Sequence, residues 1–240
     1  MPQTGSREPS GLDREITIAI GNTTLSATLT IPDRSKGIVL FAHGSGSSRH
    51  SRRNRYVAGV LQSSGMATLL LDLLTPDEEA VDERTAELRF DIPLLADRLV
   101  VATQWLEHTP ATKDLGAAYF GASTGAAAAL IAAARLHEAV SAVVSRGGRP
   151  DLAKDFLRLV RAPTLLIVGG NDQQVLELNQ WACDQLSCAK KKLVIVPGAT
   201  HLFEEPGALG EVAHAAADWF GRFIGTSPGG TRVLASGARA

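Results

Sequence analysis

The sequence predicts an α/β fold, with a mostly parallel twisted sheet covered on both faces by helices. Three observations lead to this class. Short apolar runs alternate along the chain with segments of helical period, the runs are apolar almost throughout, and an alternating hairpin precedes them. Nearly continuous apolar runs are typical of strands buried on both faces, and strands that alternate with helices form parallel sheets.

The strands come first. Residues 15–20 and 23–31 alternate in polarity around Gly21-Asn22, which predicts an N-terminal antiparallel hairpin. Six apolar runs follow, and we expect each to be a buried strand: 37–42, 67–71, 115–120, 140–144, 164–168 and 192–196.

The helices lie between these runs. From Ile92 to Leu106 apolar residues recur every three or four positions, Asp91 is placed to cap the segment and Pro93 falls in its first turn. The segment 209–223 repeats this spacing, and the Ala-rich segment 126–136 predicts another helix. Strand and helix therefore alternate over most of the chain.

At 240 residues the chain is long enough for one large domain, and no linker divides it. We expect a single domain over residues 14–224, with flexible termini at 1–13 and 225–240. The longest candidate insertion, 74–90, spans fewer than twenty residues, so the sequence leaves little room for a cap.

Composition excludes several classes of protein. With 45% hydrophobic residues, 20% charged residues and a net charge of -1, the chain is neither disordered nor a candidate for nucleic-acid binding. It has no apolar run long enough to span a membrane and no apolar segment of a secretory signal near its start, which favours a cytoplasmic location. Cys183 and Cys188 are expected to be reduced, and no metal-binding spacing is present.

A candidate nucleophile lies in Gly121-Ala-Ser123-Thr-Gly125, between a predicted strand and the Ala-rich helix. A serine at such a turn adopts a strained backbone that exposes its hydroxyl, and flanking glycines remove side chains that would collide there. The alternative is a plain tight turn, because GxSxG strings also arise by chance. The strand-turn-helix context favours Ser123 as a nucleophile.

A candidate acid and a candidate base follow later strands. Asp172 ends Gly169-Gly-Asn-Asp172, where it could hold an imidazole or simply cap the next helix. His201 is the only one of six histidines in a loop directly after a strand that also follows Ser123 and Asp172. The order nucleophile, acid, base is that of α/β-hydrolases.

The first of the six apolar runs leads into His43-Gly44-Ser45-Gly46. Its glycines would let backbone approach a bound group, and the Ser45 amide could form an oxyanion hole with the Thr124 amide at the helix N-terminus. We interpret His43 as structural. His108, His137 and His214 are also expected to be structural, whereas His50 remains open to substrate contact.

These motifs resemble those of the α/β-hydrolases, and within them the dienelactone hydrolase-like group, over about residues 14–224. The resemblance implies an esterase or lactonase that needs no cofactor and acts on a small ester or lactone. Dienelactone hydrolases themselves carry a cysteine nucleophile, so Ser123 counts against dienelactone as the substrate. A shallow site is expected, because a large cap is absent from the sequence pattern.

Arginines cluster near the expected mouth of the site: Arg49, Arg52, Arg53 and Arg55 after the oxyanion loop, and Arg146 and Arg149 after a later strand. Arginine suits bidentate capture of carboxylate or phosphate. The hypothesis is that Arg49 and Arg146 bind an anionic part of the substrate. The alternative is a solvated surface balanced by the acidic run 77–83.

Two other functions stay open. Gly44-Ser-Gly46 with Asp72 after the next strand resembles part of a dinucleotide-binding fingerprint, which would indicate an oxidoreductase, but Arg49 occupies the place of the third glycine. A non-catalytic binding protein on a hydrolase fold is the second alternative. Neither requires Ser123, Asp172 and His201 in this order.

Overall fold

The structure is a computed structural model that describes residues 13–225. Eight strands form one sheet in the order β1-β2-β4-β3-β5-β6-β7-β8. All neighbours are parallel except β1 with β2 and β2 with β4, as expected for a hairpin that precedes a parallel sheet. The strands are β1 Arg14–Ile20, β2 Thr23–Thr30, β3 Gly37–Ala42, β4 Ala67–Leu71, β5 Gly116–Ala122, β6 Val140–Arg146, β7 Thr164–Gly169 and β8 Lys191–Val196.

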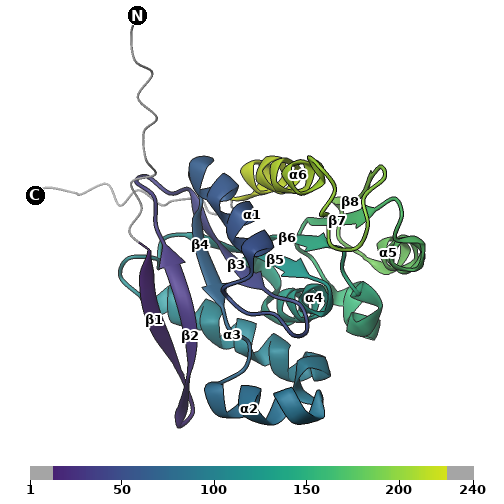
Figure 1. Cartoon of the computed structure of the whole chain (residues 1–240). Helices are drawn as coiled ribbons and strands as arrows, with labels where there is room; N and C mark the ends of the chain where they lie inside the picture. The colour runs from purple at the N-terminus through teal and green to yellow at the C-terminus, as the bar shows by residue number, and fades with distance from the viewer. Residues whose placement is uncertain (1–12, 226–240) are drawn as a thin grey trace, which may run out of the picture.

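Helices cover both faces of this sheet (Figure 1). One core forms between the sheet and α1 and α6, and the second forms under α3, α4 and α5. The α-helices are α1 Arg52–Ser63, α2 Pro76–Thr85, α3 Ile92–His108, α4 Thr124–Leu136, α5 Gln173–Gln185 and α6 Ala208–Phe223. The predicted fold class is therefore confirmed.

At their carboxyl ends, β5 and β6 each extend two residues beyond their apolar runs. β5 continues to Ala122 and β6 to Arg146, because these residues pair with each other in the parallel ladder. Their small or charged side chains hid the pairing from a hydrophobicity pattern. The extension brings the last residues of both strands to the edge where the candidate nucleophile lies.

The segment 74–90 contains a helix, α2, and a short 3-10 turn, and is not a plain loop. Thr75 accepts a hydrogen bond from the Glu78 amide while the Glu78 carboxylate accepts one from the Thr75 amide, a capping box that starts α2. A short 3-10 turn, Leu88–Phe90, leads on to α3, which Asp91 caps as expected. The insertion between β4 and α3 holds only these two short elements, as its length in the sequence predicted.

The two cysteines form no disulfide. Among residues 13–225, no helix is long and apolar enough to cross a membrane, and no cluster of metal-ligating side chains is found.

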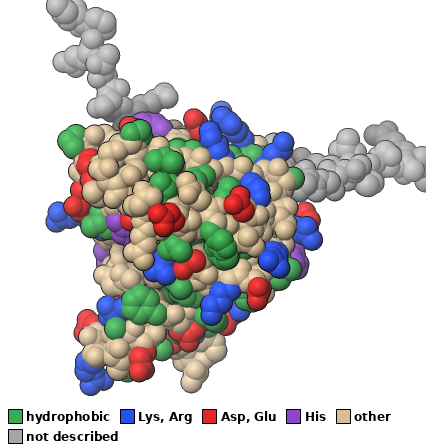
Figure 2. Space-filling model, turned by 90° about the vertical axis from the view of Figure 1, so that its right-hand side faces the viewer, with side chains coloured by type: hydrophobic (Ala, Val, Ile, Leu, Met, Phe, Trp, Pro, Cys, Tyr) green, Lys and Arg blue, Asp and Glu red, His purple; other side chains and the backbone are tan. Residues whose placement is uncertain are grey.

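Beside the edge of the sheet, Trp181 on α5 and Ile195 on β8 are partly exposed. Figure 2 shows this side of the molecule, where apolar side chains alternate with charged ones. The expected flexible termini lie almost wholly outside the described residues.

Candidate active site

The carboxyl ends of the parallel strands bring the candidate residues to one edge of the sheet. Ser123 follows β5, Asp172 follows β7 and His201 follows β8. Ser123 and His201 line the same pocket, which has a volume of about 260 Å³. Chain segments that are far apart in sequence therefore supply one site.

Ser123 has the strained backbone expected of a nucleophile at a sharp turn. Its φ of 51° and ψ of -122° are rare for a residue with a side chain. A Cβ at Gly125 would lie 2.3 Å from the Ala42 carbonyl oxygen, and one at Gly121 would lie 2.4 Å from the Ala126 Cα. Gly125 thus lets the start of α4 lie against the end of β3, and Gly121 lets β5 lie against α4, which is the steric role expected of the two glycines.

Asp172 is held by the histidine rather than by the helix that follows it. It occupies the N-cap position of α5, yet its side chain makes no capping hydrogen bond. His201 Nδ1 instead lies 2.7 Å from Asp172 Oδ2. Since an ionised carboxylate only accepts, Nδ1 carries the proton, which leaves Nε2 of a neutral ring free to accept one.

Ser123 Oγ and His201 are not joined by a hydrogen bond within the described residues. Catalytic hydrogen bonds are often longer in unliganded enzymes and tighten when substrate binds. The structure therefore places the imidazole of His201, oriented by Asp172, and Ser123 at its sharp turn on one pocket.

The loop after β3 approaches Ser123 closely. A Cβ at Gly44 would lie 3.1 Å from the Ser123 Cβ, a contact tighter than most, so glycine favours this approach. The Ser45 amide donates to Thr124 Oγ1 at 2.9 Å. An oxyanion would compete with that hydroxyl for the amide, a condition that sequence reasoning did not foresee.

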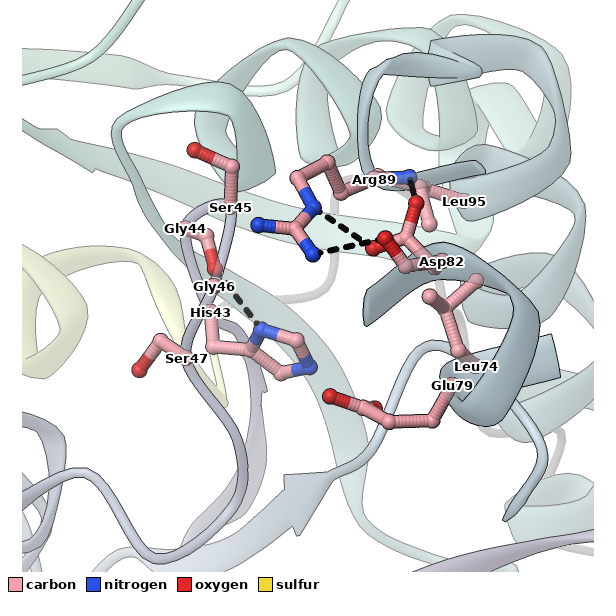
Figure 3. A pocket seen from close by; sticks show the side chains of 10 residues that line it. All are labelled: His43, Gly44, Ser45, Gly46, Ser47, Leu74, Glu79, Asp82, Arg89 and Leu95. Atoms are coloured by element: carbon pink, nitrogen blue, oxygen red, sulfur yellow. Dashed lines mark hydrogen bonds and ion pairs between the residues drawn. The ribbon is translucent and has the colours of Figure 1, made fainter. Parts of the chain in front are cut away.

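His43 supports this loop through a hydrogen bond to Gly44, as Figure 3 shows. Its Nε2 accepts from the Leu73 amide at 3.1 Å, so the proton is on Nδ1, which donates to the Gly44 carbonyl at 2.9 Å. Burial lowers the pKa of His43, which keeps the ring neutral. On the other side of the small cavity drawn there, Arg89 pairs with Asp82 at 2.6 Å. These contacts agree with a structural role for His43.

The arginines of the predicted cluster have different surroundings. Arg49 pairs with Glu15 at 3.0 Å and with Asp72, and it does not belong to the pocket lined by Ser123. Arg146, at the end of β6, does line that pocket and is only 7% exposed. The structure thus separates the two arginines that the sequence grouped together.

Arg146 is charged although it is buried. Burial and the nearby charge of Arg53 lower the pKa of Arg146 to about 10, so the guanidinium stays protonated at neutral pH. It stacks over the Phe203 ring, with 5.9 Å from the guanidinium carbon to the ring centroid.

Several polar residues of the pocket were missed by the sequence analysis. Ser47, Ser51 and Asn54 line it together with Arg53. Ser51 caps α1 by accepting from the Asn54 amide, so the N-terminus of α1 borders the pocket. A serine just before the helical segment was the available signal for this cap.

The dinucleotide alternative gains no support. Asp72, its candidate ribose-binding acid, accepts from the Arg49 amide at 2.7 Å and also binds the Arg49 guanidinium. The carboxylate that would bind a ribose is therefore already engaged within the protein.

Comparisons with known proteins agree with this fold. A family model described as the dienelactone hydrolase family matches residues 25–226. The crystal structure of dienelactone hydrolase from Anabaena variabilis is 58% identical, with a TM-score of 0.87, over 89% of this chain and 99% of that one. Est1E from Butyrivibrio proteoclasticus has a TM-score of 0.72 at 17% identity, over 87% of this chain and 98% of its own, and shares the fold.

The curated relatives are named as transferases and not as hydrolases. Two Mycobacterium tuberculosis proteins, provisionally named as phosphoribosyl transferases, are 57% identical over 224 residues, which is 93% of this chain. The match covers 49% of their length, so the chain spans about half the length of the curated relatives it matches. The name therefore refers to proteins that contain more than the region compared.

Proposed function

Because the chain belongs to the dienelactone hydrolase family, we propose that it is a serine hydrolase that cleaves a carboxylic ester or a lactone through an acyl-enzyme on Ser123. The observation that supports this most is the side chain of Asp172. It binds His201 at 2.7 Å instead of capping α5, beside the pocket that Ser123 lines. A carboxylate that only capped a helix would have no reason to hold the ring.

The chemistry follows from these positions. His201 Nε2 takes the proton of Ser123 as Oγ attacks the acyl carbon, and later returns it to the alcohol that leaves. Asp172 holds Nδ1–H and stabilises the imidazolium formed in between. Water then repeats the sequence on the acyl-enzyme and releases the acid.

The developing oxyanion would be stabilised by the amides of Ser45 and Thr124. Thr124 is the first residue of α4, and the free amides at the N-terminus of a helix stabilise a negative charge placed beside them. The Ser45 amide becomes available to the oxyanion when the Thr124 hydroxyl turns away, or it donates to the hydroxyl and the oxyanion together. No metal or cofactor is needed for these steps.

A serine-directed fluorophosphonate tests the proposal. It should label the protein, and peptide mapping should place the label on Ser123. Ser123→Ala should lose both label and hydrolysis of short 4-nitrophenyl esters, by about 10³-fold or more in kcat/KM. Ser141→Ala, at the amino end of β6 away from the pocket, is the matched control. Label on another residue, or full hydrolysis by Ser123→Ala, would refute the assignment.

A further inference from the structure

The segment 146–149, which ends β6 and follows it, binds the backbone of the candidate nucleophile on both sides. The Ser123 amide donates to the Arg146 carbonyl at 3.2 Å, and the Arg149 amide donates to the Ser123 carbonyl at 3.0 Å. The strained φ and ψ of Ser123 persist only where neighbouring contacts determine them. We call this segment the β6 loop, and it supplies two of those contacts.

The β6 loop also lies against the candidate base. Gly147 has a φ of 51°, and a Cβ there would lie 3.1 Å from the His201 carbonyl oxygen and 3.6 Å from His201 Cε1. The Gly147 amide donates to the Ile167 carbonyl of β7 at 2.8 Å, which ties the loop to the sheet. Since Ser123 bonds to this loop and His201 packs on it, a shift of the loop would change the spacing between their side chains.

A buried asparagine holds the β6 loop from α5. Asn179 is fully buried, and its Nδ2 donates to the Gly148 carbonyl at 2.9 Å and to the Val175 carbonyl of its own helix at 2.8 Å. Carbonyl oxygens only accept, so the amide nitrogen faces them, and among residues 13–225 Asn179 Oδ1 has no hydrogen-bond partner. Burying an amide with an unpaired oxygen costs free energy that a leucine of similar size would avoid. The bond to Gly148 is what an apolar side chain could not supply.

The helix that carries Asn179 also begins at the candidate acid. Asp172 is the N-cap residue of α5, and its carboxylate binds His201. Asn179 lies about two turns further along the same helix. One helix is therefore bonded to His201 at its start and to the β6 loop, and so to Ser123, at its middle.

We propose that Asn179 is a positioning residue for the hydrolase reaction. Its amide holds the Gly148 carbonyl and thereby fixes the β6 loop where Ser123 Oγ can meet His201 Nε2. Asn179 itself touches no substrate, because it is fully buried and does not line the pocket of Ser123. This inference rests on the proposed hydrolase function and adds to it a residue that acts on the chemical step and not on substrate binding.

Asn179→Leu in the full chain removes the donor and keeps the size of the side chain. We expect kcat on 4-nitrophenyl butyrate to fall by about tenfold to 100-fold while KM changes by less than about twofold, because misplaced reacting groups slow the chemistry without weakening binding. The rate of fluorophosphonate labelling at Ser123 should fall by a similar factor, since it needs the same attack by Oγ. Asn179→Ser, whose side chain is smaller and whose hydroxyl is one bond too short to reach Gly148, should show the same changes.

Thr103→Val is the matched control for the loss of a buried polar contact. Thr103 is also fully buried, and its Oγ1 donates to the Leu99 carbonyl at 2.9 Å within α3, outside the pocket of Ser123. We expect this variant to have a lower thermal unfolding temperature, yet to keep kcat within about twofold. Thermal unfolding of every variant shows whether it is folded at the assay temperature.

The outcomes separate this proposal from the hydrolase assignment. Unchanged kcat in folded Asn179→Leu or Asn179→Ser would refute the role of Asn179 and leave the hydrolase intact. A loss of kcat that Thr103→Val shares, or a loss of activity that lies in KM, would also refute it, because either result indicates a general effect on the fold or on the pocket. An unaltered chain that neither reacts at Ser123 nor hydrolyses esters would refute the hydrolase and this proposal together.

Discussion

Two regions beyond the strand ends treat their arginines in opposite ways. In the outer region, formed by Arg49 with Glu15 and Asp72, each charge has a partner in the protein. In the inner region, formed by the pocket of Ser123, Arg146 has no ion-pair partner among residues 13–225. The paired charges of Arg49 hold the loop after β3 to the sheet, whereas Arg146 packs over the Phe203 ring. Arginines that the sequence groups together thus meet opposite electrostatic surroundings in the fold.

The largest expected effect distinguishes Asp172, which binds His201 beside the inner region, from Asp72 of the outer region. Asp172→Asn should lower kcat/KM on short esters by about 10³- to 10⁴-fold, because an amide cannot stabilise the imidazolium and favours the wrong tautomer. Steady-state kinetics check this result. Asp72→Asn is the matched control from the outer region and should change kcat/KM by far less while lowering the thermal unfolding temperature. Equal kinetic losses in both variants would remove the distinction between the regions.

A medium effect concerns the stability of the outer region. Arg49→Leu should lower the free energy of unfolding by about 1–2 kcal/mol, because the buried side of Asp72 loses its guanidinium partner. Urea unfolding measures this difference. Arg146→Leu, the counterpart in the inner region, should leave the protein as stable or make it more stable, since it removes an uncompensated buried charge. A larger loss for Arg146→Leu than for Arg49→Leu would reverse the comparison.

The smallest effect is the pH dependence that His43 contributes. Burial lowers the pKa of His43 from 6.5, so the unfolded chain binds more protons than the folded one below pH 6.5. Stability should therefore fall as the pH drops, with His43 contributing at most about 1 kcal/mol between pH 6.5 and 5.5. The measurement is urea unfolding at both pH values. His43→Gln should show a shallower dependence, and an unchanged or steeper one would contradict a buried neutral ring.

The ends of β5 and β6 show where sequence reasoning stops. Their apolar runs located both strands, but Ala122 and Arg146 lie outside those runs and belong to the ladder all the same. Hydrophobic pattern reports burial, whereas pairing with a neighbouring strand depends on the position of that neighbour. The sequence analysis named both residues, but it missed that they belong to strands, because these strands end in small or charged side chains.

The segment 74–90 gives a different lesson. Thr75 and Glu78 have the spacing of a capping box, so α2 was within reach of a local argument. Its weakly apolar composition gave no helical stripe, and the segment was treated only as an insertion. A local hydrogen-bond signal was present where the hydrophobic signal was absent.

By itself the sequence determined the alternation of strand and helix, the turn around Ser123 with its two glycines, and the order of Ser123, Asp172 and His201 along the chain. These depend on local sterics and on hydrophobic period, which neighbouring residues encode. Only the tertiary structure decided that Asp172 binds His201 rather than capping α5, and that Arg49 is neutralised while Arg146 is not. Both depend on which distant charges the fold brings within a few ångströms, and Coulomb energies and desolvation act through space rather than along the chain.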